Sequence, residues 1–430
     1  MDATLINYLI TILFTAYSLY YVFLFVASLR RKKFHIADKH HEHNNGKKHL
    51  VLVPAHNEEN VISEICQDLL AQDYPPNDFR VIIVADNCDD GTVDIVHGFQ
   101  NQTLLLMERK SDVRGKGAAL DYALTNFEQL AGNFNPDYVI VLDADNRVSN
   151  DFLSALDSHA CIGYPAIQCN VKTKNPDSSL LAKSSYYEGL TLQRLWQEGK
   201  DKLGLCNALA GTGEAIRYDL ISTMKFGNSL TDDLDLTIRL ALKGMKVKYA
   251  HYPETYDEKP NKLSVEMRRR VRWATGHFQT YFKYSWQLVK RPSKVGFDAF
   301  FYLSNIMSPI IIWLSSIISA LYVANLVTFV PVPIWYSATI SFVFIPLFMG
   351  TAWLEGDSGF LKNIVPFYIL MALWLIVAPI GLAKALKGNA VWERTPHGES
   401  LKPDSPAFNA ICATTASSLT LNPMPRRAQA

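Results

Sequence analysis

The stretch Val139-Ile140-Val141-Leu142-Asp143-Ala144-Asp145-Asn146 decides how this chain is expected to fold. Its aliphatic, partly β-branched run, preceded by Tyr138, is typical of a fully buried strand in a parallel sheet. Asp143 and Asp145 stand at its carboxyl end, and side chains two residues apart in extended backbone point to the same side. Paired carboxylates there need a cation or hydrogen-bond donors. Mg²⁺ or Mn²⁺ carrying a diphosphate would supply the cation. The alternative is that the two aspartates belong to a solvated turn that they cap.

The sequence around this strand alternates between strand and helix patterns. We expect strands at 50–54, 80–84, 104–106 and 138–142, and helices at 58–70, 91–98 and 117–130. Strands interleaved with helices predict right-handed βαβ units and a mostly parallel sheet of the α/β class. Such sheets bind ligands at the carboxyl ends of their strands.

Polar residues follow each of the four predicted strands. They are Asn57 and Glu58 after the first, Asp86 after the second, Arg114 and Lys116 after the third, and Asp143 and Asp145 after the fourth. The carboxyl ends of parallel strands meet at one edge, so these side chains should share a site. Polar residues at the carboxyl ends of four successive strands are a more specific signal than any single motif.

A nucleotide diphosphate lying across this edge would meet most of these groups. Asp86 could accept a hydrogen bond from a base N–H, and Glu58 could support the base or the ribose. Lys116 has a glycine on each side, which lets the backbone approach phosphate, although taken alone this motif favours a simple turn. Asp145, helped by Asp143, would hold a metal that bridges the phosphates and stabilises the departing diphosphate.

Two later segments supply candidates for the remaining chemistry. In Thr231-Asp232-Asp233, clustered carboxylates raise one another's pKa, which favours Asp233 as a general base. Capping of the helix that begins there is the alternative. In the basic, aromatic segment 264–290, Arg272 can bind phosphate in bidentate fashion. Trp273 offers a flat face for a sugar ring.

Composition separates apolar ends from a globular middle. The formal net charge of +1 gives no general case for nucleic-acid binding, and the cysteines show no paired spacing, which suits a reducing cytosol. Residues 6–29 are long enough to cross a bilayer, which needs about 20 apolar residues. Arg30-Arg31-Lys32-Lys33 follows and predicts that the next segment is cytosolic. A cleaved signal peptide is disfavoured because its charges would precede the apolar run.

Three further apolar segments, near 302–326, 333–353 and 364–386, bring the expected number of spans to four. A chain that starts outside would then end outside, whereas Lys384 and Lys387 indicate an inside end. A re-entrant segment or a shifted boundary would resolve the conflict. The expected organisation is an anchor at 1–33, a polar linker at 34–47, a cytosolic α/β domain at 48–263, a basic amphipathic interfacial helix region at 264–297, about three membrane segments within 298–388 and a polar, disordered tail at 389–430.

Taken in order, the motifs resemble those of membrane-integrated family-2 glycosyltransferases, the group that includes cellulose, hyaluronan and poly-N-acetylglucosamine synthases. The resemblance covers roughly 49–290 and the layout of the flanking spans. The motifs are Pro54-Ala55-His56-Asn57-Glu58, Asp86-Asn87-Cys88-Asp89-Asp90-Gly91-Thr92, Gly115-Lys116-Gly117, Asp143-Ala144-Asp145, Gly211-Thr212-Gly213, Thr231-Asp232-Asp233 and Arg269-Arg270-Val271-Arg272-Trp273.

The resemblance implies a GT-A-like nucleotide-sugar-binding domain flanked by transmembrane helices, a UDP-sugar donor, Mg²⁺ or Mn²⁺, and inversion at the anomeric carbon. Asp86 would contact the uracil, Asp143 the nucleotide sugar or the metal, and Asp145 the metal. Asp233 would be the general base, while Arg272 and Trp273 would match the Arg-Trp of the family's Gln-x-x-Arg-Trp signature. Asn57, Glu58, Lys116 and Asp232 complete the expected substrate contacts.

Three positions depart from the family pattern. Ala85 stands where many members have the first of two aspartates, Asp232 replaces a glutamate, and Arg269 replaces the glutamine that accompanies processive synthesis. Arg269 and the small number of spans make a single transfer to a lipid-linked acceptor fit at least as well as polymer synthesis.

The expected function is therefore transfer of a hexose or N-acetylhexosamine to a polysaccharide or lipid-linked acceptor. It would occur at the cytosolic face of a multi-pass protein in the inner (plasma) membrane, in exopolysaccharide or glycolipid synthesis, with the lipid bilayer and polysaccharide-synthesis proteins as partners. A catalytically inactive nucleotide-sugar sensor or scaffold is the alternative. A solute transporter is disfavoured because the acids nearest the spans, Glu355 and Asp357, fall in a predicted loop.

Overall fold

The computed structural model describes residues 3–29, 46–291, 293–326, 347–357, 359 and 364–388. Most of the predicted polar linker, most of the predicted span at 333–353 and the whole predicted tail lie outside these residues.

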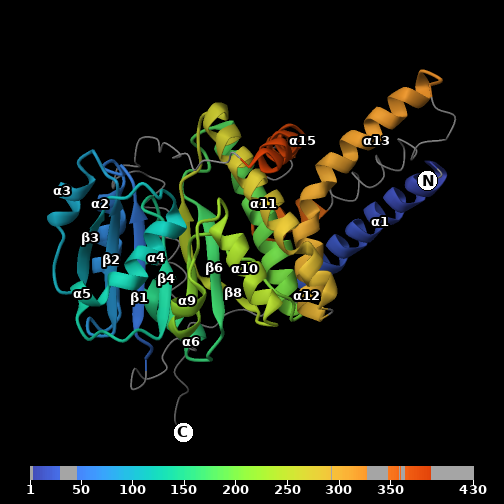
Figure 1. Ribbon diagram of the computed structural model, residues 1–430. Coiled ribbons are helices and arrows are strands. Elements are labelled where there is room, and N and C mark those ends of the chain that lie inside the picture. The colour runs from blue at the N-terminus through green and yellow to red at the C-terminus, as the bar shows by residue number, and fades with distance from the viewer. Residues whose placement is uncertain are drawn as a thin grey trace, which may run out of the picture.

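The core of the described structure is one mixed sheet of eight strands in the order β3-β2-β1-β4-β7-β6-β8-β5 (Figure 1). Its pairs β3–β2, β2–β1, β1–β4 and β6–β8 are parallel, and the remaining three are antiparallel. The predicted mostly parallel sheet is confirmed. The strands are β1 His49–Ala55, β2 Phe79–Asp86, β3 Leu104–Arg109, β4 Tyr138–Val141, β5 Arg147–Val148, β6 Ala166–Thr173, β7 Glu214–Arg217 and β8 Val247–Asp257.

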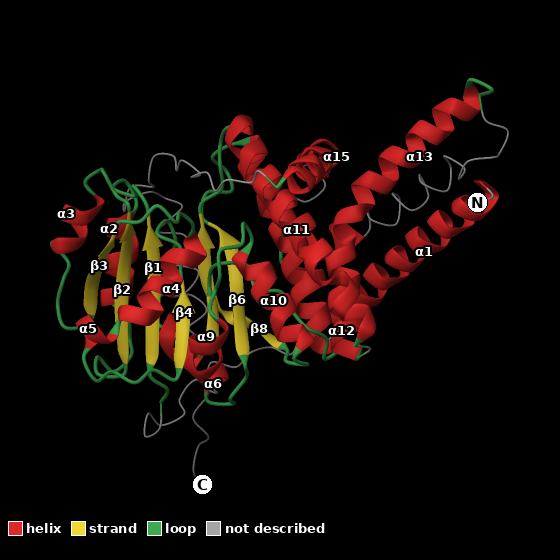
Figure 2. Cartoon of the chain, in the orientation of Figure 1, coloured by secondary structure: helices red, strands yellow, loops and turns green. Residues whose placement is uncertain are grey.

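Helices cover both faces of this sheet, as Figure 2 shows. Successive side chains of β1 point to opposite faces, so Leu50 and Leu52 pack in one core while Val51 and Val53 pack in the other. The first core is closed by α4 Lys116–Asn126, α9 Tyr218–Met224 and α10 Asp232–Leu242, and the second by α2 Ile62–Leu70, α3 Thr92–His97 and α6 Phe152–Ala160. A short helix, α5 Glu128–Ala131, follows α4.

The sequence pattern over residues 186–210 predicts an amphipathic helix, and the structure has a composite helix there. It consists of α7 Leu180–Thr191, a π-helix at Leu192–Gly199 and α8 Lys200–Lys202. Gly204 has a φ of +63°, a left-handed conformation typical of the residue just after a helix. Residues 205–210 therefore continue without helical structure, and the predicted end of this helix was too late.

The predicted basic helix at 264–290 is α11 Leu263–Lys290. It packs against α10, α12 Lys294–Ser304 and α15 Ile364–Lys387. Its arginines do not all face outward: Arg270 is fully buried and pairs with Glu266 and Glu188. One face of α11 thus belongs to the protein interior.

Three helical stretches in the described part of the chain are long and apolar enough to cross a membrane, namely Thr11–Ser28, Lys294–Val323 and Tyr368–Lys387. The first lies within α1 Ala3–Ser28, the second combines α12 with α13 Ser308–Val323, and the third lies within α15. Figure 1 shows α1 and α13 extending away from the sheet on the same side. Polar contacts hold α1 near the start of the second stretch, because Tyr20 donates to Asp298 at 2.5 Å and Tyr21 to Asn305 at 3.3 Å.

Candidate active site

A cavity of about 1690 Å³ lies at the carboxyl ends of the parallel strands. Residues from β1, β2, the β4–β5 loop, α4, α7, α10, α11 and α15 contribute to its lining. Nine of the eleven predicted site residues line it: Glu58, Asp86, Lys116, Asp143, Asp145, Asp232, Asp233, Arg272 and Trp273. The sheet edge therefore gathers residues that are up to 215 positions apart, from Glu58 to Trp273.

Lys116, at the start of α4, reaches across this edge to the Asp-x-Asp segment. Its ammonium donates to the Asp143 carboxylate and, at 2.5 Å, to the carbonyl oxygen of Gly211. Burial lowers the pKa of Lys116, but Asp143 and Asp232 outweigh it and raise that pKa above its usual range. Lys116 is therefore a fixed cation beside two carboxylates.

The Asp143–Asn146 turn is organised by Asn146, a residue the sequence analysis did not single out. The Asn146 side chain is fully buried and donates to Asp145 at 3.3 Å. Its oxygen accepts from the Asp143 N–H at 3.2 Å and from the hydroxyls of Thr212 and, at 3.3 Å, Thr255. The turn is thereby tied to the Gly211-Thr212-Gly213 loop.

Asp143 and Asp145 are the groups that fit a divalent cation. Burial raises the pKa of the Asp143 carboxyl, and the charge of Asp145 acts in the same direction. Among the described residues, no three His, Cys, Asp or Glu side chains are grouped as a complete metal site. Mg²⁺, however, is commonly bound through one or two carboxylates, with waters and substrate phosphates as its other ligands. The pair thus suits a cation that arrives with a diphosphate.

Asp233 lies in the first turn of α10 and lines the cavity. Burial and the neighbouring Asp232 carboxylate raise the pKa of Asp233 to about 6. Its Oδ1 accepts from the Leu234 N–H at 2.8 Å, whereas the Thr231 side chain makes no capping hydrogen bond. Helix capping by Thr231 therefore does not account for this acidic cluster.

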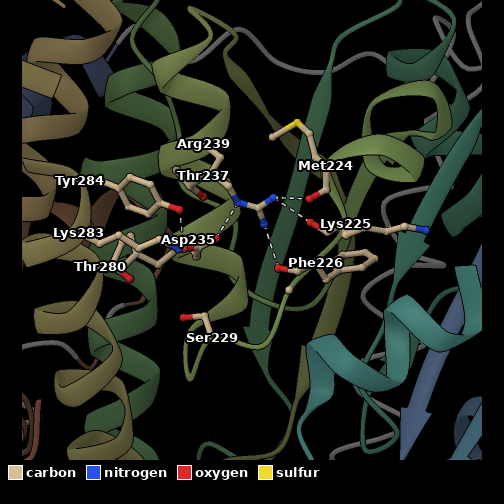
Figure 3. A network of polar contacts seen from close by, with 12 residues as sticks. Met224, Lys225, Phe226, Ser229, Asp235, Thr237, Arg239, Thr280, Lys283 and Tyr284 are labelled. Atoms are coloured by element: carbon tan, nitrogen blue, oxygen red, sulfur yellow. Dashed lines mark hydrogen bonds and ion pairs between the residues drawn. The ribbon is translucent and has the colours of Figure 1, made fainter. Parts of the chain in front are cut away.

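A polar network fixes the helix that carries Asp233 (Figure 3). Asp235 accepts from Arg239 at 2.6 Å, and from Lys283 and Tyr284 of α11 at 3.0 Å each. The Arg239 guanidinium also donates to the loop that follows α9, through the carbonyl oxygens of Met224, Lys225 and Phe226. These bonds join α9, α10 and α11 behind the cavity and set where Asp233 can lie.

Asp86 and Asn57 hold the neighbouring loops. In the β2–β3 register Asp86 pairs with Arg109, whose guanidinium donates to Asp86 Oδ1 at 2.5 Å. Asn57 has a φ of +60° and exchanges hydrogen bonds with Asp89, which connects the loops after β1 and β2. Asn57 and Arg114 are the predicted site residues that lie outside the cavity lining.

The α11 side of the cavity presents cations and an indole ring. Arg272 donates to the carbonyl oxygen of Leu230 at 3.1 Å, and burial lowers its pKa. The Arg269 guanidinium lies 4.4 Å from the centroid of the Trp273 ring and pairs with Glu266 at 3.3 Å. The arginine that replaces the family's glutamine is thus held by its own helix.

Three groups of the site were not found from the sequence: Trp374, which lines the cavity, and Glu214 and Arg109, which support it from outside the lining. Glu214 begins β7 and is 2% exposed; burial, with Asp233 nearby, raises its pKa to about 8. The only indication of Glu214 in the sequence is its position directly after Gly211-Thr212-Gly213. Arg109 depends on strand register, and Trp374 lies in an apolar segment far along the chain.

Replacing Gly117 by alanine is expected to destabilise the protein and weaken UDP binding. A Cβ at position 117 would lie 1.9 Å from the carbonyl oxygen of Gly227, so α4 must move, together with Lys116. Thermal unfolding and calorimetric titration with UDP measure both effects. Gly189→Ala is the control for stability, since its Cβ meets nothing within 4 Å. A helical alanine there should raise stability by up to about 1 kcal/mol. Equal melting temperatures for the two variants would contradict this account.

The fold and the composition of this edge define a GT-A-like glycosyltransferase fold. The solved mannosyltransferase PcManGT of Pyrobaculum calidifontis, in complex with GDP-Man and Mn²⁺, matches 89% of this chain and 99% of its own with a TM-score of 0.59 at 19% identity. The model of the family described as "Glycosyltransferase like family 2" matches residues 47–276, more than half of the chain. The chain belongs to this family.

Two curated relatives illustrate the range of the family. The chain is 29% identical over 247 residues to a beta-monoglucosyldiacylglycerol synthase of Trichormus variabilis, covering 56% of this chain and 50% of that protein. It is 22% identical over 368 residues to a poly-beta-1,6-N-acetyl-D-glucosamine synthase of Staphylococcus epidermidis, covering 81% and 87%. Apart from this second relative, the chain spans about half the length of the curated relatives it matches.

Proposed function

We propose that the protein transfers a hexose or N-acetylhexosamine from a UDP-sugar to a hydroxyl of a lipid-linked or polysaccharide acceptor, with inversion at the anomeric carbon. One observation carries this proposal: Asp233, the candidate general base, and Lys116, the cation proposed to face the diphosphate, both lie close to Gly211 in the cavity. A Cβ placed on Gly211 would lie 3.4 Å from Asp233 Oδ2 and 3.8 Å from Lys116 Nζ. Family membership supports the same reaction class.

In this mechanism the chain's own residues position the donor and move one proton. Asp233 accepts the proton of the acceptor hydroxyl as its oxygen attacks the anomeric carbon. The bond between that carbon and the β-phosphate oxygen breaks, and UDP leaves with the electron pair. Lys116 and Arg272, both in the cavity lining, offset the charge that develops on the diphosphate.

Asp143 and Asp145 would hold Mg²⁺ or Mn²⁺, which neutralises diphosphate charge when bound. Asn146 and Lys116 keep Asp143 oriented before the donor arrives. Candidate membrane helices on either side of the domain support a multi-pass protein in the plasma membrane with its active site on the cytosolic face.

The donor and the metal requirement are tested together by measuring UDP release from a panel of UDP-sugars in membranes. We expect release with one donor, with Mg²⁺ or Mn²⁺, and its loss on chelation or in Asp145→Ala. Asp177→Ala is the control, since that side chain is 84% exposed and lies outside the cavity lining. Binding of UDP-sugars without release under any condition would favour the inactive sensor instead.

A further inference from the structure

Part of the cavity wall is built by helices instead of strand ends. Ser185 and Glu188 come from α7, Gln193 from the π-helix, Trp273 from α11 and Trp374 from α15. Buried packing between Tyr187 of α7 and the 347–354 and α15 helices holds this wall together. Because α15 contains a stretch able to cross a membrane, this side of the cavity borders the candidate membrane region.

Ser185, in the cavity wall, has a buried hydroxyl without a hydrogen-bond partner among the described residues. The residue is 4% exposed and lines the cavity, yet its hydroxyl has no hydrogen-bond partner within the described chain. The neighbouring Ser184, which is also buried, donates to the carbonyl oxygen of Leu180 at 2.8 Å. Buried hydroxyls are normally paired. The hydroxyl of Ser185 therefore lacks a partner, which a ligand in the cavity could supply.

Gln193 adds a second unused group on the same wall. Its Nε2 donates to the carbonyl oxygen of Val171 at 3.4 Å. Its buried Oε1 has no partner among the residues that the structure describes. Two unpaired polar atoms from adjoining helical segments thus line one cavity, which is the pattern expected of a site that hydrogen-bonds a ligand.

Glu188 is held rigidly between α11 and α15. Arg270 donates to both of its oxygens, at 3.1 and 2.5 Å, and the Trp374 indole donates to Oε1 at 3.3 Å. Burial raises the pKa of Glu188, but Arg270 outweighs it and lowers that pKa below its usual range, so Glu188 stays ionised. A fixed carboxylate bonded to Trp374, in a wall that also includes Trp273, suits hydroxyl donors. The two rings suit the apolar faces of sugar or glycerol units.

We infer that this wall binds the hydroxyl-bearing, uncharged head group of a membrane lipid, which serves as the acceptor. Ser185, Glu188 and Trp374 are positioning residues for the lipid whose hydroxyl reaches Asp233. The lipid tails would lie along α15, which a soluble acceptor does not require. The inference rests on the proposed glycosyl transfer and narrows its acceptor.

The test uses the full chain in lipid nanodiscs, the active UDP-sugar, and diacylglycerol as the lipid acceptor. Ser185→Ala should raise the KM for diacylglycerol about two- to tenfold, since it removes one hydrogen bond to the ligand. The KM for the UDP-sugar should not change. Ser184→Ala is the matched control, because its hydroxyl bonds only within α7 and it lies outside the cavity lining. Trp374→Phe should likewise raise the KM for diacylglycerol.

The outcomes separate this inference from the proposed function. Normal UDP release with an unchanged lipid KM in both Ser185→Ala and Trp374→Phe would overturn the inference alone. Transfer to a water-soluble oligosaccharide but not to diacylglycerol would overturn it in favour of a polymer acceptor. Failure of the wild-type protein to release UDP from any donor would overturn the proposed function and this inference with it.

Discussion

Replacing Asp233 by asparagine is expected to lower the rate of sugar transfer by about 10²–10⁴-fold, the usual contribution of a positioned general base. The substitution keeps the size of the side chain and an oxygen that can accept from the Leu234 N–H. Donor binding should therefore persist, because the residues proposed to hold the diphosphate are untouched. Radiolabelled transfer and calorimetric titration with UDP measure the two properties separately.

The pH profile of the wild-type protein should carry the signature of the same group. Burial and Asp232 raise the pKa of Asp233 to about 6, and only the ionised carboxylate can accept a proton. The transfer rate should therefore fall as the pH drops through about 6 and level off above it. Asp232→Asn removes the neighbouring charge and should move this transition to lower pH.

Asp219→Asn is the matched control for Asp233→Asn. Asp219 also lies in the first turn of a helix, α9, but its side chain is 61% exposed and outside the cavity lining. It should transfer at the wild-type rate. An Asp233→Asn protein that retained most of its transfer rate, with the acidic limb of the pH profile unchanged, would exclude Asp233 as the base.

The parallel half of the sheet could be predicted because its strands are short buried runs separated by amphipathic helices. The predicted strand at 80–84 became β2 Phe79–Asp86, and that at 138–142 became β4 Tyr138–Val141. Local patterns of this kind carry their own signal, since a buried strand has no polar alternation. The carboxyl-edge residues followed directly from the strand ends.

The remaining groups of the site depend on contacts that no local pattern encodes. Arg109 meets Asp86 because β2 and β3 align in one register, and Asn146 meets Thr212 across the sheet. The antiparallel strand β7 between β4 and β6 brings Glu214 beneath the Gly-rich loop. The basic pattern of α11 does not reveal that Arg270 is buried and paired with an acid 82 residues away.

That arginine carries the largest expected effect on stability. Arg270→Met leaves the buried carboxylates of Glu188 and Glu266 without their main cation, and breaking such a pair from one side costs about 3–5 kcal/mol. Because the cluster also contacts Trp374, the packing of α15 against α7 and α11 should weaken. We expect the protein in detergent to lose its monodisperse state at a lower midpoint temperature. Gel filtration after heating measures the fraction that stays monodisperse.

A surface ion pair provides the matched comparison for Arg270. Arg217 pairs with Asp219, but the two side chains are 39% and 61% exposed, and exposed pairs contribute only about 0–1 kcal/mol. Arg217→Met should leave the midpoint temperature nearly unchanged. The triple variant Arg270→Met, Glu188→Gln, Glu266→Gln removes the orphaned charges and should recover part of the loss. Equal stability of Arg270→Met and Arg217→Met would contradict this account. It would mean that the contacts of Arg270 with Glu188 and Trp374 do not hold α15 against the catalytic domain.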